Sequence, residues 1–540
     1  MDLKYAVIGG GVAGTYVAWR LVTSGAGAGK TQLFEYSDRI GGRLYSKKLP
    51  GMPNIPAELG GMRFLPTSHL LVKSIVDKLG LPTQPFLMGN PAPVDPNDPD
   101  GPKIGQSRNM LFLRGTHLTN ADLKDAAKVP YKLAADERGL SPTDLQIKVM
   151  KQLAGDRYNS LTTEEWCDVM AMGEPLYKIG YWNLLAQYLS SEAYHFMQDG
   201  GGYDANTANT NSVYQLPATE YGDVPVHYKC LADGYQSLPL TLEKQLKDHN
   251  GLPTQMQSAL SHIERIKGGY RLTFKRTQDI DGHYQIPPDC ETFQVEAEHV
   301  ILAMPRRSLE LVDWADFEAD DWLRSNLKSV AIQKAFKLLL GFEEPWWRKL
   351  GLVAGRSTTD LPLRQTYYFP SEEDFSPDDG NKSAMLLATY SDMATVPFWR
   401  GLEHAAPFTG HDTPFTKGQS PVPATETPVT GQMVNAAVKQ LGELHGLSDV
   451  PKPYTALYHD WSADPYGGGW HEWKAGYRFP DVIPKMLQPV DDEQVYICGE
   501  AYSTDQGWAE GSLATAETML QKHLNLDRPS WIDADWKLGG

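Results

Sequence analysis

The sequence predicts an α/β fold, and three features of the chain support this prediction. An apolar run with strand character, Tyr5 to Ile8, precedes a glycine turn and a helical segment from Val12 to Leu21. A second strand-like run near the C-terminus, Val495 to Cys498, also leads through small residues into a helix. Helical periodicity dominates residues 120–194, as in Glu164–Met172. Strands that alternate with helices are typical of a parallel sheet covered by helices, here with a helical insertion.

Length and charge limit the classes of function. At 540 residues the chain is too long for one hydrophobic core, so two or three domains are expected. The net charge of −17 argues against nucleic acid and anionic membranes as partners, because phosphate binding needs clustered Lys and Arg. No apolar run approaches the roughly 20 residues of a membrane span, and no signal peptide is visible. We therefore expect a cytoplasmic protein, with four scattered cysteines in the reduced state and no metal site.

The glycine turn after the first strand has the spacing G-x-G-x-x-G. Gly9, Gly11 and Gly14 permit a tight turn, close approach of the backbone to a pyrophosphate, and close packing of helix on strand. The pyrophosphate would lie at the helix N-terminus, formed by Val12 and Ala13, where backbone N–H groups and the helix dipole favour an anion. The sequence therefore predicts a Rossmann-like dinucleotide site.

The residues after the second strand indicate which dinucleotide binds. Glu35 follows an apolar run about 20 residues beyond Gly14, where an acid can accept hydrogen bonds from ribose hydroxyls. The run Arg39-Ile40-Gly41-Gly42-Arg43 follows, and a plain NAD site does not need it. This run resembles the R-x-G-G-R run of the flavin-containing amine oxidase superfamily. The resemblance implies FAD as the cofactor, with Tyr36 and Arg43 among its contacts.

A second glycine pair precedes a candidate substrate ligand, Arg63. Gly60 and Gly61 let the backbone approach a flat ring, and a guanidinium forms two parallel hydrogen bonds to a carboxylate. A surface arginine in a salt bridge is the alternative. The segment resembles the G-x-M-R segment of the L-amino-acid oxidase branch of the superfamily, which packs under the flavin. The resemblance implies that Gly60, Gly61, Met62 and Arg63 contact FAD and that Arg63 binds the substrate carboxylate.

One lysine interrupts the apolar run from Ala335 to Phe342. Burying an ammonium group is costly unless it is hydrogen-bonded. In the superfamily, a lysine upstream of the tryptophan of a similar E-P-x-W stretch holds a water beside flavin N5. Counting back from Trp347 identifies Lys337 as that residue. Lys334 remains an alternative, as does a lysine at a strand edge that reaches solvent.

The predicted strand from Met385 to Tyr390 ends in a candidate for a second carboxylate ligand. Residues 356–370, just upstream, closely resemble a stretch of the snake-venom L-amino-acid oxidases, and Tyr390 matches the second carboxylate ligand of that branch. A phenol can donate to a carboxylate oxygen that the arginine leaves free. An ordinary core tyrosine is the alternative.

The C-terminal strand and helix form a second cofactor anchor. Glu500 follows the strand, and the helix N-terminus after it can receive another part of the cofactor through backbone N–H groups. The family resemblance places Glu500 near the phosphate and ribityl chain, and Gly507 and Trp508 against the flavin. Trp508 would also form one wall of an aromatic cage for the substrate. Ala509 and Ser512 complete the expected contacts of this helix with FAD.

Weaker signals add residues to both sites. By position in the superfamily, Leu260 would place its backbone against the adenine side of FAD. The segment from Trp461 to Gly476 resembles a W-x-x-D-P segment near the superfamily's active site. Trp470, His471 and Trp473 are therefore pocket candidates.

The resemblance covers nearly the whole chain and implies three domains. Residues 91–107, rich in Pro, Asp and Gly, are expected to form an exposed loop. The expected domains are a Rossmann-like FAD-binding domain (1–50, 229–307 and 483–525), a mixed-sheet substrate-binding domain (51–115 and 308–482), and an inserted helical domain (116–228).

The activity that the resemblance implies is FAD-dependent oxidative deamination of L-amino acids. A hydride passes from Cα to flavin N5, the imino acid hydrolyses to a 2-oxo acid and ammonia, and oxygen becomes hydrogen peroxide. Arg63 and Tyr390 would position the substrate, with Lys337, Gly507 and Trp508 beside it. A monoamine or polyamine oxidase, a flavin-dependent amino-acid monooxygenase and a non-enzymatic FAD-binding scaffold are the alternatives. The sequence determines neither the preferred side chain nor the oligomeric state, for which a homodimer is one option.

Overall fold

The computed structural model describes residues 2–88, 109–204, 208–216, 227–250, 252–280, 283–423, 427–462 and 468–539. The predicted loop at residues 91–107 lies outside these ranges. Within these ranges, no helix has the length and apolar character needed to span a bilayer.

The first sheet contains the predicted N-terminal strand and combines parallel with antiparallel pairing. Its strands are, in order, β16 (Asp313–Trp314), β11 (Ser258–Ile266), β12 (Gly269–Arg276), β15 (Thr292–Leu302), β1 (Leu3–Ile8) and β2 (Thr31–Phe34), with β24 (Val495–Ile497) paired to β15. β24, β15, β1 and β2 run parallel to one another, while β12 pairs antiparallel with β11 and with the first half of β15. The Rossmann-like parallel arrangement predicted from the sequence is confirmed.

Three helices pack together on this sheet: α1 (Val12–Thr23), α8 (Ser237–Asn250) and α15 (Ala509–Lys522). Helix α1 is buried from Val12 to Val22, because it contacts β1 and β2 as well as α8 and α15. A buried ion pair connects the first helix to the last. Arg20 donates from Nε and Nη2 to the two carboxylate oxygens of Glu517, at 3.0 Å each, and Tyr16 donates to the same carboxylate at 2.7 Å.

The second sheet is mixed, as predicted. Its strands are, in order, β22 (Thr455–Asp460), β18 (Ala335–Phe342), β21 (Ala384–Asp392), β20 (Gln365–Ser371), β19 (Gly355–Thr359), β6 (Met110–Leu113) and β7 (Thr116–Thr119). Only the β19–β6 pair within this sheet is parallel. All residues of β18 are buried, and helix α13 (Gly431–His445) packs against the sheet with an apolar face that includes Met433, Ala437 and Leu441.

The inserted segment is mainly helical: α3 (Pro142–Ala154), α4 (Thr163–Asp168), α5 (Tyr181–Tyr188), α6 (Ser191–Gly200) and α7 (Ser212–Gln215). Ser141 and Thr162 cap α3 and α4 through capping boxes with acids three residues on. The prediction of a helix over Glu164–Met172 was wrong at its C-terminal end. The helix ends at Asp168, because Met172 and Gly173 take positive φ angles in a hairpin between the next two short strands.

Short elements connect these parts. The ribbon pairs are β3 (Ser46–Lys48) with β4 (Pro56–Glu58), β5 (Thr83–Phe86) with β10 (Tyr228–Leu231), β8 (Met170–Ala171) with β9 (Glu174–Pro175), β13 (Gln278–Ile280) with β14 (His283–Gln285), and β17 (Val330–Gln333) with β23 (Trp470–Trp473). The remaining α-helices are α2 (Leu70–Leu79), α9 (Arg306–Leu309), α10 (Ala315–Ala319), α11 (Asp321–Asn326), α12 (Val396–Arg400) and α14 (Phe479–Met486).

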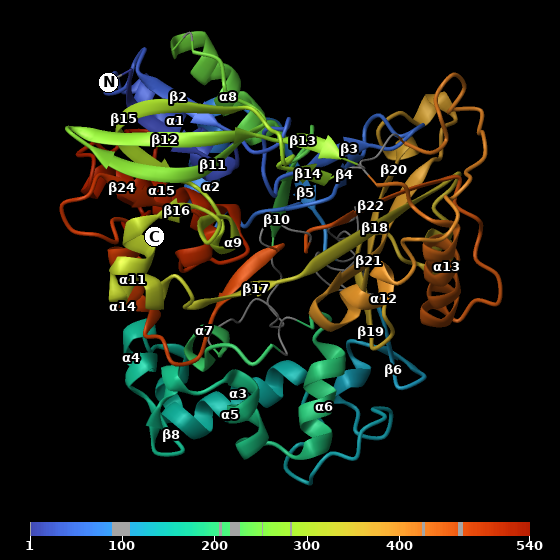
Figure 1. Ribbon diagram of the computed structural model, residues 1–540. Helices are drawn as coiled ribbons and strands as arrows, with labels where there is room; N and C mark the ends of the chain where they lie inside the picture. The colour runs from blue at the N-terminus through green and yellow to red at the C-terminus, as the bar shows by residue number, and fades with distance from the viewer. Residues whose placement is uncertain are drawn as a thin grey trace.

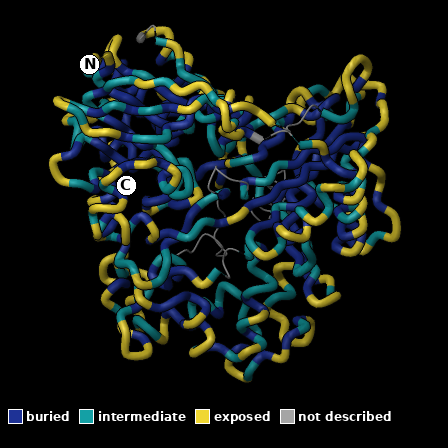
Figure 2. The backbone as a smooth tube through the Cα atoms, viewed as in Figure 1, coloured by how far each residue is buried: buried dark blue, intermediate teal, exposed yellow. Residues whose placement is uncertain are grey.

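Figure 1 shows the two sheets side by side in the upper half of the view and the helices α3 to α6 below them. Buried backbone concentrates within the sheets, and exposed backbone follows the outer loops (Figure 2).

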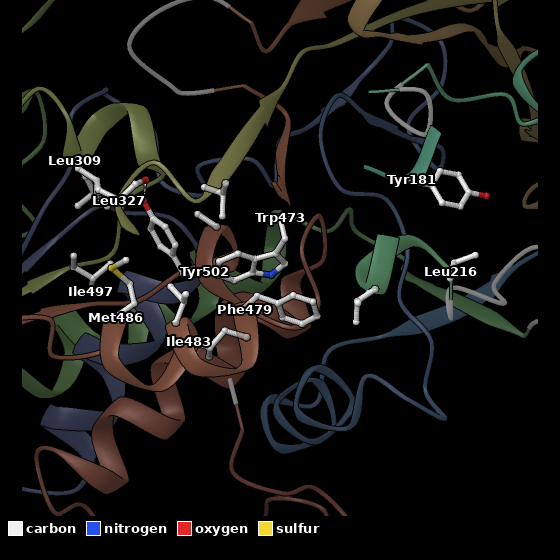
Figure 3. Close-up of a cluster of buried hydrophobic side chains, with 14 of the residues drawn as sticks. Tyr181, Leu216, Leu309, Leu327, Trp473, Phe479, Ile483, Met486, Ile497 and Tyr502 are labelled. Carbon is white, nitrogen blue, oxygen red and sulfur yellow. Dashed lines mark hydrogen bonds between the residues drawn. The ribbon is translucent and has the colours of Figure 1, made fainter. Parts of the chain in front are cut away.

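One hydrophobic core continues from the first sheet into the insertion. In the close-up of Figure 3, Trp473 stacks on Phe479 with ring centroids 5.4 Å apart, beside Met486 and Tyr502. Residues of the insertion such as Leu216 belong to the same cluster.

The buried Arg20–Glu517 pair gives a stability prediction. Glu517→Gln keeps the shape of the side chain but leaves the Arg20 guanidinium buried without a counter-ion. We expect unfolding to become easier by about 3–5 kcal/mol, as for other broken buried pairs. Denaturant unfolding followed by circular dichroism measures the loss. Glu174→Ala, which removes the exposed Lys178–Glu174 pair, should leave the midpoint unchanged, and equal effects of the two substitutions would contradict this account.

Candidate active site

A cavity of about 1070 Å³ lies where the two sheets and the insertion meet. Its wall includes the carboxyl ends of β1 and β2, residues of β18, β21 and β23, and part of α7. Of the predicted site residues, Gly14, His471 and Trp473 do not line it. The others do: Gly9, Gly11, Val12, Ala13, Glu35, Tyr36, Arg43, Gly60, Gly61, Met62, Arg63, Leu260, Lys337, Tyr390, Trp470, Glu500, Gly507, Trp508, Ala509 and Ser512.

The glycine turn between β1 and α1 forms an open cradle in this wall. Gly9 has φ +111°, which residues with a side chain rarely adopt. A Cβ on Gly11 would meet nothing closer than the Gly42 Cα at 3.9 Å, so the backbone there is open to a ligand. A Cβ on Gly14 would collide with the Gly9 carbonyl, so Gly14 serves the packing of helix on strand. Helix α1 has neither a side-chain cap nor an acid in its first turn.

Glu35 is held in place by the same turn. One carboxylate oxygen accepts from the Gly10 N–H at 2.6 Å, and the other accepts from the N–H and hydroxyl of Ser37 at 2.8 and 2.7 Å. A carboxylate has about four lone-pair positions, two on each oxygen, so the oxygen bonded to Gly10 can still accept from a ligand hydroxyl.

At the carboxyl end of β24, Glu500 also lines the cavity and joins three segments. It accepts hydrogen bonds from the Arg43 guanidinium, from His471 Nδ1 at 2.6 Å and from the Gly507 N–H at 3.0 Å. Burial would raise the pKa of Glu500, but Arg43 and His471 hold it well below its usual range. Burial lowers the pKa of His471, which favours the neutral ring. Nδ1 of this ring carries the hydrogen and donates it to the ionised Glu500 carboxylate. Helix α15 begins just beyond Trp508.

Arg63 is a buried guanidinium in the cavity wall, with 8% of its surface exposed. The adjacent Phe64 exchanges two backbone hydrogen bonds with Lys229, which holds the loop before α2. Nη1 donates to the Met88 sulfur at 3.5 Å and to the Tyr367 hydroxyl at 3.4 Å. Nε has no hydrogen-bond partner, and the Cζ atom lies 4.5 Å from the Tyr228 ring centre. Within the described ranges, Arg63 forms no ion pair.

Lys337 faces the cavity, whereas Lys334 is exposed and lies outside its lining. The Lys337 Nζ donates to the carbonyls of Gly60 at 2.5 Å and Glu58 at 3.2 Å. It also lies 4.7 Å from the centre of the Tyr390 ring. Burial lowers the pKa of the Lys337 ammonium and raises the pKa of the nearby Glu58 carboxyl. The opposite charge of each group offsets part of this shift in the other.

Aromatic rings form the wall next to Lys337. Tyr203, from the insertion, packs edge-on against Tyr390 and Trp470, with ring centroids 5.3 and 6.1 Å apart. Trp508 stacks against Tyr228 at 6.2 Å. Gly507 lies against Trp470, because a Cβ there would lie 3.5 Å from the indole ring.

Strand alternation separates the pocket candidates on β23. Trp470 lines the cavity, but His471 and Trp473 do not. Their side chains point to the other face of the strand, where His471 binds Glu500 and Trp473 donates to the Ser503 carbonyl at 2.9 Å. Glu472 lies on the same face as Trp470 and also lines the cavity.

The family of flavin containing amine oxidoreductases matches residues 12–399. The chain belongs to this family. The predicted family and its cofactor, FAD, are thereby confirmed, and the protein is a flavin-dependent oxidoreductase.

Other members of this family match almost the whole chain. Aplysianin-A from Aplysia kurodai is 28% identical over 539 residues, or 97% of this chain and 90% of aplysianin-A. Achacin from Lissachatina fulica is 26% identical over 535 residues, or 97% and 93% of the two chains. An L-amino-acid oxidase from Bungarus fasciatus is 22% identical over 539 residues, or 97% and 86%. A triple mutant of putrescine oxidase superposes with a TM-score of 0.65 at 14% identity, covering 97% and 99%, which shows the shared fold.

The cavity of this flavoenzyme fits FAD. The open glycine turn and the uncapped start of α1 can receive the pyrophosphate, and Glu35 retains acceptor capacity for the ribose. The start of α15 also lines the cavity and provides a second set of backbone donors. The cavity also extends beyond these anchors to Arg63 and Tyr390, so space for a substrate adjoins the cofactor region.

Four residues near the substrate region had no predicted role: Glu58, Tyr203, Tyr367 and Glu472. Tyr367 donates to Gln365 and accepts from Arg63. Burial alone would raise the pKa of the Tyr367 hydroxyl, but the positive charges of Arg63 and Arg356 lower it overall. Tertiary packing brings Tyr367 to Arg63 and Tyr203 to Tyr367, and the sequence holds no local signal for these contacts. Glu472 could have been found, because period-2 alternation along β23 places it beside Trp470.

The packing of Gly14 against Gly9 gives a prediction for cofactor binding. Gly14→Ala places a methyl group in the Gly9 carbonyl, so the turn must open and the cradle is lost. We expect the purified variant to contain about a tenth of the wild-type flavin or less, measured by absorbance after denaturation. The matched control is Gly401→Ala, whose new Cβ meets nothing closer than 3.5 Å and should retain full flavin content. Normal flavin in both variants would refute the packing role.

Proposed function

We propose that this enzyme oxidatively deaminates L-α-amino acids to 2-oxo acids, releasing ammonia and hydrogen peroxide. The observation that carries the proposal is the buried Arg63 in the cavity wall, which forms no ion pair with any described residue. The similarity to the Bungarus fasciatus L-amino-acid oxidase over 97% of the chain supports it.

Arg63 needs an anion from the ligand. A buried guanidinium loses its hydration, and the protein returns only a thioether, a phenol and the faces of aromatic rings. A carboxylate would satisfy the planar fork with two parallel charge-assisted hydrogen bonds. An amine substrate without a carboxylate would leave this cation unpaired. The geometry therefore favours an amino acid over a simple amine.

The neighbouring residues would set the orientation of the bound amino acid. Tyr390 lies at the end of β21, within the aromatic wall formed with Tyr203 and Trp470, and can donate its hydroxyl to the substrate carboxylate. Gly507, which lies against Trp470, and Trp508 would line the adjoining part of the cavity. When bound, FAD would supply the two-electron acceptor for oxidation at Cα and the route for those electrons to oxygen. The residues of the chain contribute positioning and the exclusion of water.

Lys337 would act at the edge of the same space. Its ammonium holds the carbonyls of Glu58 and Gly60, and so fixes the segment that leads to Arg63. An ammonium has three N–H donors, and the third points only toward the Met62 sulfur at 3.8 Å. That weak contact leaves a donor for a water molecule beside the substrate.

Substitution of Arg63 tests the proposal directly. Arg63→Lys keeps a cation but removes the fork, so we expect kcat/KM for L-amino acids to fall by roughly tenfold to hundredfold, from the loss of one or two charged hydrogen bonds. Peroxide release over a panel of amino acids measures the change. Turnover of the corresponding decarboxylated amines should be negligible in the wild type.

Two outcomes of that experiment would favour the alternatives. Equal turnover of amines and amino acids by the wild type, unaffected by Arg63→Lys, would indicate an amine oxidase. An amide product in place of the 2-oxo acid would indicate an amino-acid monooxygenase, which could use the same carboxylate site. Mass spectrometry of the product separates these cases.

Lys337→Met tests the second role. The side chain keeps its length but loses its donors, so we expect the oxygen-dependent step to slow by about tenfold or more while anaerobic reduction by substrate changes less. Stopped-flow absorbance of the flavin follows the two half-reactions separately. Lys334→Met, at an exposed position on the same chain segment, is the control and should behave as wild type. An equal slowing of both half-reactions would assign Lys337 a purely structural role.

A further inference from the structure

Glu472 is a buried acid in the cavity wall to which the proposed reaction assigns no role. It lies on β23, has 5% of its surface exposed, and lines the cavity. One carboxylate oxygen accepts from the Thr210 hydroxyl and the Gln215 side-chain amide, each at 2.9 Å, and the other accepts from the Trp470 indole N–H at 3.3 Å. Two of these three donors come from the insertion.

All three partners of Glu472 are neutral. Within the described ranges no lysine, arginine or histidine forms an ion pair with it. Neutral dipoles compensate only part of the cost of burying a carboxylate, and burial raises the pKa of Glu472 to about 7. The oxygen that accepts only the long bond from Trp470 retains capacity for another donor. A cation from a ligand would supply both the donor and the missing charge.

The position of Glu472 relative to the carboxylate site limits which part of a ligand it can meet. The indole of Trp470, whose N–H donates to Glu472, packs edge-on against Tyr390 with ring centroids 6.5 Å apart. The Trp470 ring therefore lies between Glu472 and Tyr390, and both residues line the same cavity. A group at the far end of an amino-acid side chain would match this separation better than the α-amino group, which lies next to the carboxylate.

We propose that Glu472 binds the cationic end of a basic L-amino acid whose carboxylate is held by Arg63. Lysine, ornithine and arginine are the chemical class that fits, because each carries a carboxylate at one end and a cation at the other. This inference rests on the proposed function. The inserted segment, through Thr210 and Gln215, fixes the acid and hence the preference for a basic side chain.

Three substrates given to the wild-type holoenzyme separate this inference from the proposed function. L-norleucine has the chain of lysine without the terminal ammonium, and cadaverine is lysine without the carboxylate. Turnover of lysine well above the other two supports both proposals. Equal kcat/KM for lysine and norleucine overturns the role of Glu472 but retains the amino-acid oxidase. The proposed function itself is overturned if cadaverine is turned over as well as lysine, or if the enzyme turns over none of the three compounds.

Glu472→Gln tests the residue. We expect kcat/KM for lysine to fall about tenfold or more, mainly through KM, while the value for norleucine changes less than about twofold. The matched control is Asp505→Asn, which removes another acid from the cavity wall and should change both substrates equally. An equal loss for lysine and norleucine in Glu472→Gln would overturn the inference and indicate a contact with the α-amino group or a structural role. Equal lysine-selective losses in both variants would assign the preference to the overall charge of the cavity, and would also overturn it.

A binding measurement gives a readout that does not depend on turnover. 6-Aminohexanoate carries both charges but no α-amino group, and hexanoate lacks the ammonium. Changes in the flavin absorbance spectrum report the Kd of each. The wild type should bind 6-aminohexanoate at least about tenfold more tightly than hexanoate, and Glu472→Gln should bind the two about equally. A preference unchanged by the substitution would overturn the assignment even if the variant's activity were low.

Discussion

The Glu500 carboxylate joins segments that are far apart in the sequence. Arg43 from the N-terminal region, His471 on β23 and the backbone of Gly507 before α15 all donate to it. Its ionised state depends on these donors, because burial alone would keep the acid neutral. With its two oxygens engaged in this way, Glu500 fixes the start of α15 relative to the glycine turn. The two cofactor anchors thereby lie at the same edge of the first sheet, where β1 and β24 flank β15, although hundreds of residues separate them in sequence.

Local motifs explain which parts of this arrangement can be predicted from sequence. The glycine turn, Glu35 and the strand–helix order are set by residues within one βαβ unit, so spacing alone identifies them. Lys337 was identified by one motif and a count from Trp347, and the burial of every residue in β18 explains why this lysine, rather than Lys334, faces the cavity. Arg63 follows a glycine pair in the same way, and the structure places both on the cavity wall.

The remaining residues depend on contacts between distant elements. Tyr367 on β20 contacts Arg63, Tyr203 of the insertion contacts Tyr367, and no local pattern relates these positions. On β23 the expected set included Trp470 with His471 and Trp473, but side chains alternate along a strand, so only every second one can face the cavity. The helix expected to reach Met172 stopped early because a glycine at position 173 permits a tight hairpin, which periodicity in the preceding residues does not reveal.

The two halves of the proposed substrate site come from different structural layers, and this separation has a consequence. Arg63 and Tyr390 belong to segments attached to the second sheet, whereas the partners that fix Glu472 belong to the insertion. In the proposed site, the groups that would bind the carboxylate common to all amino acids lie on segments packed against the second sheet. Two of the three donors that hold Glu472, which would contact the variable side chain, lie on the insertion. Changes in the insertion can therefore alter substrate preference while the carboxylate contacts and the cofactor cradle stay the same, because these are held by different hydrogen bonds.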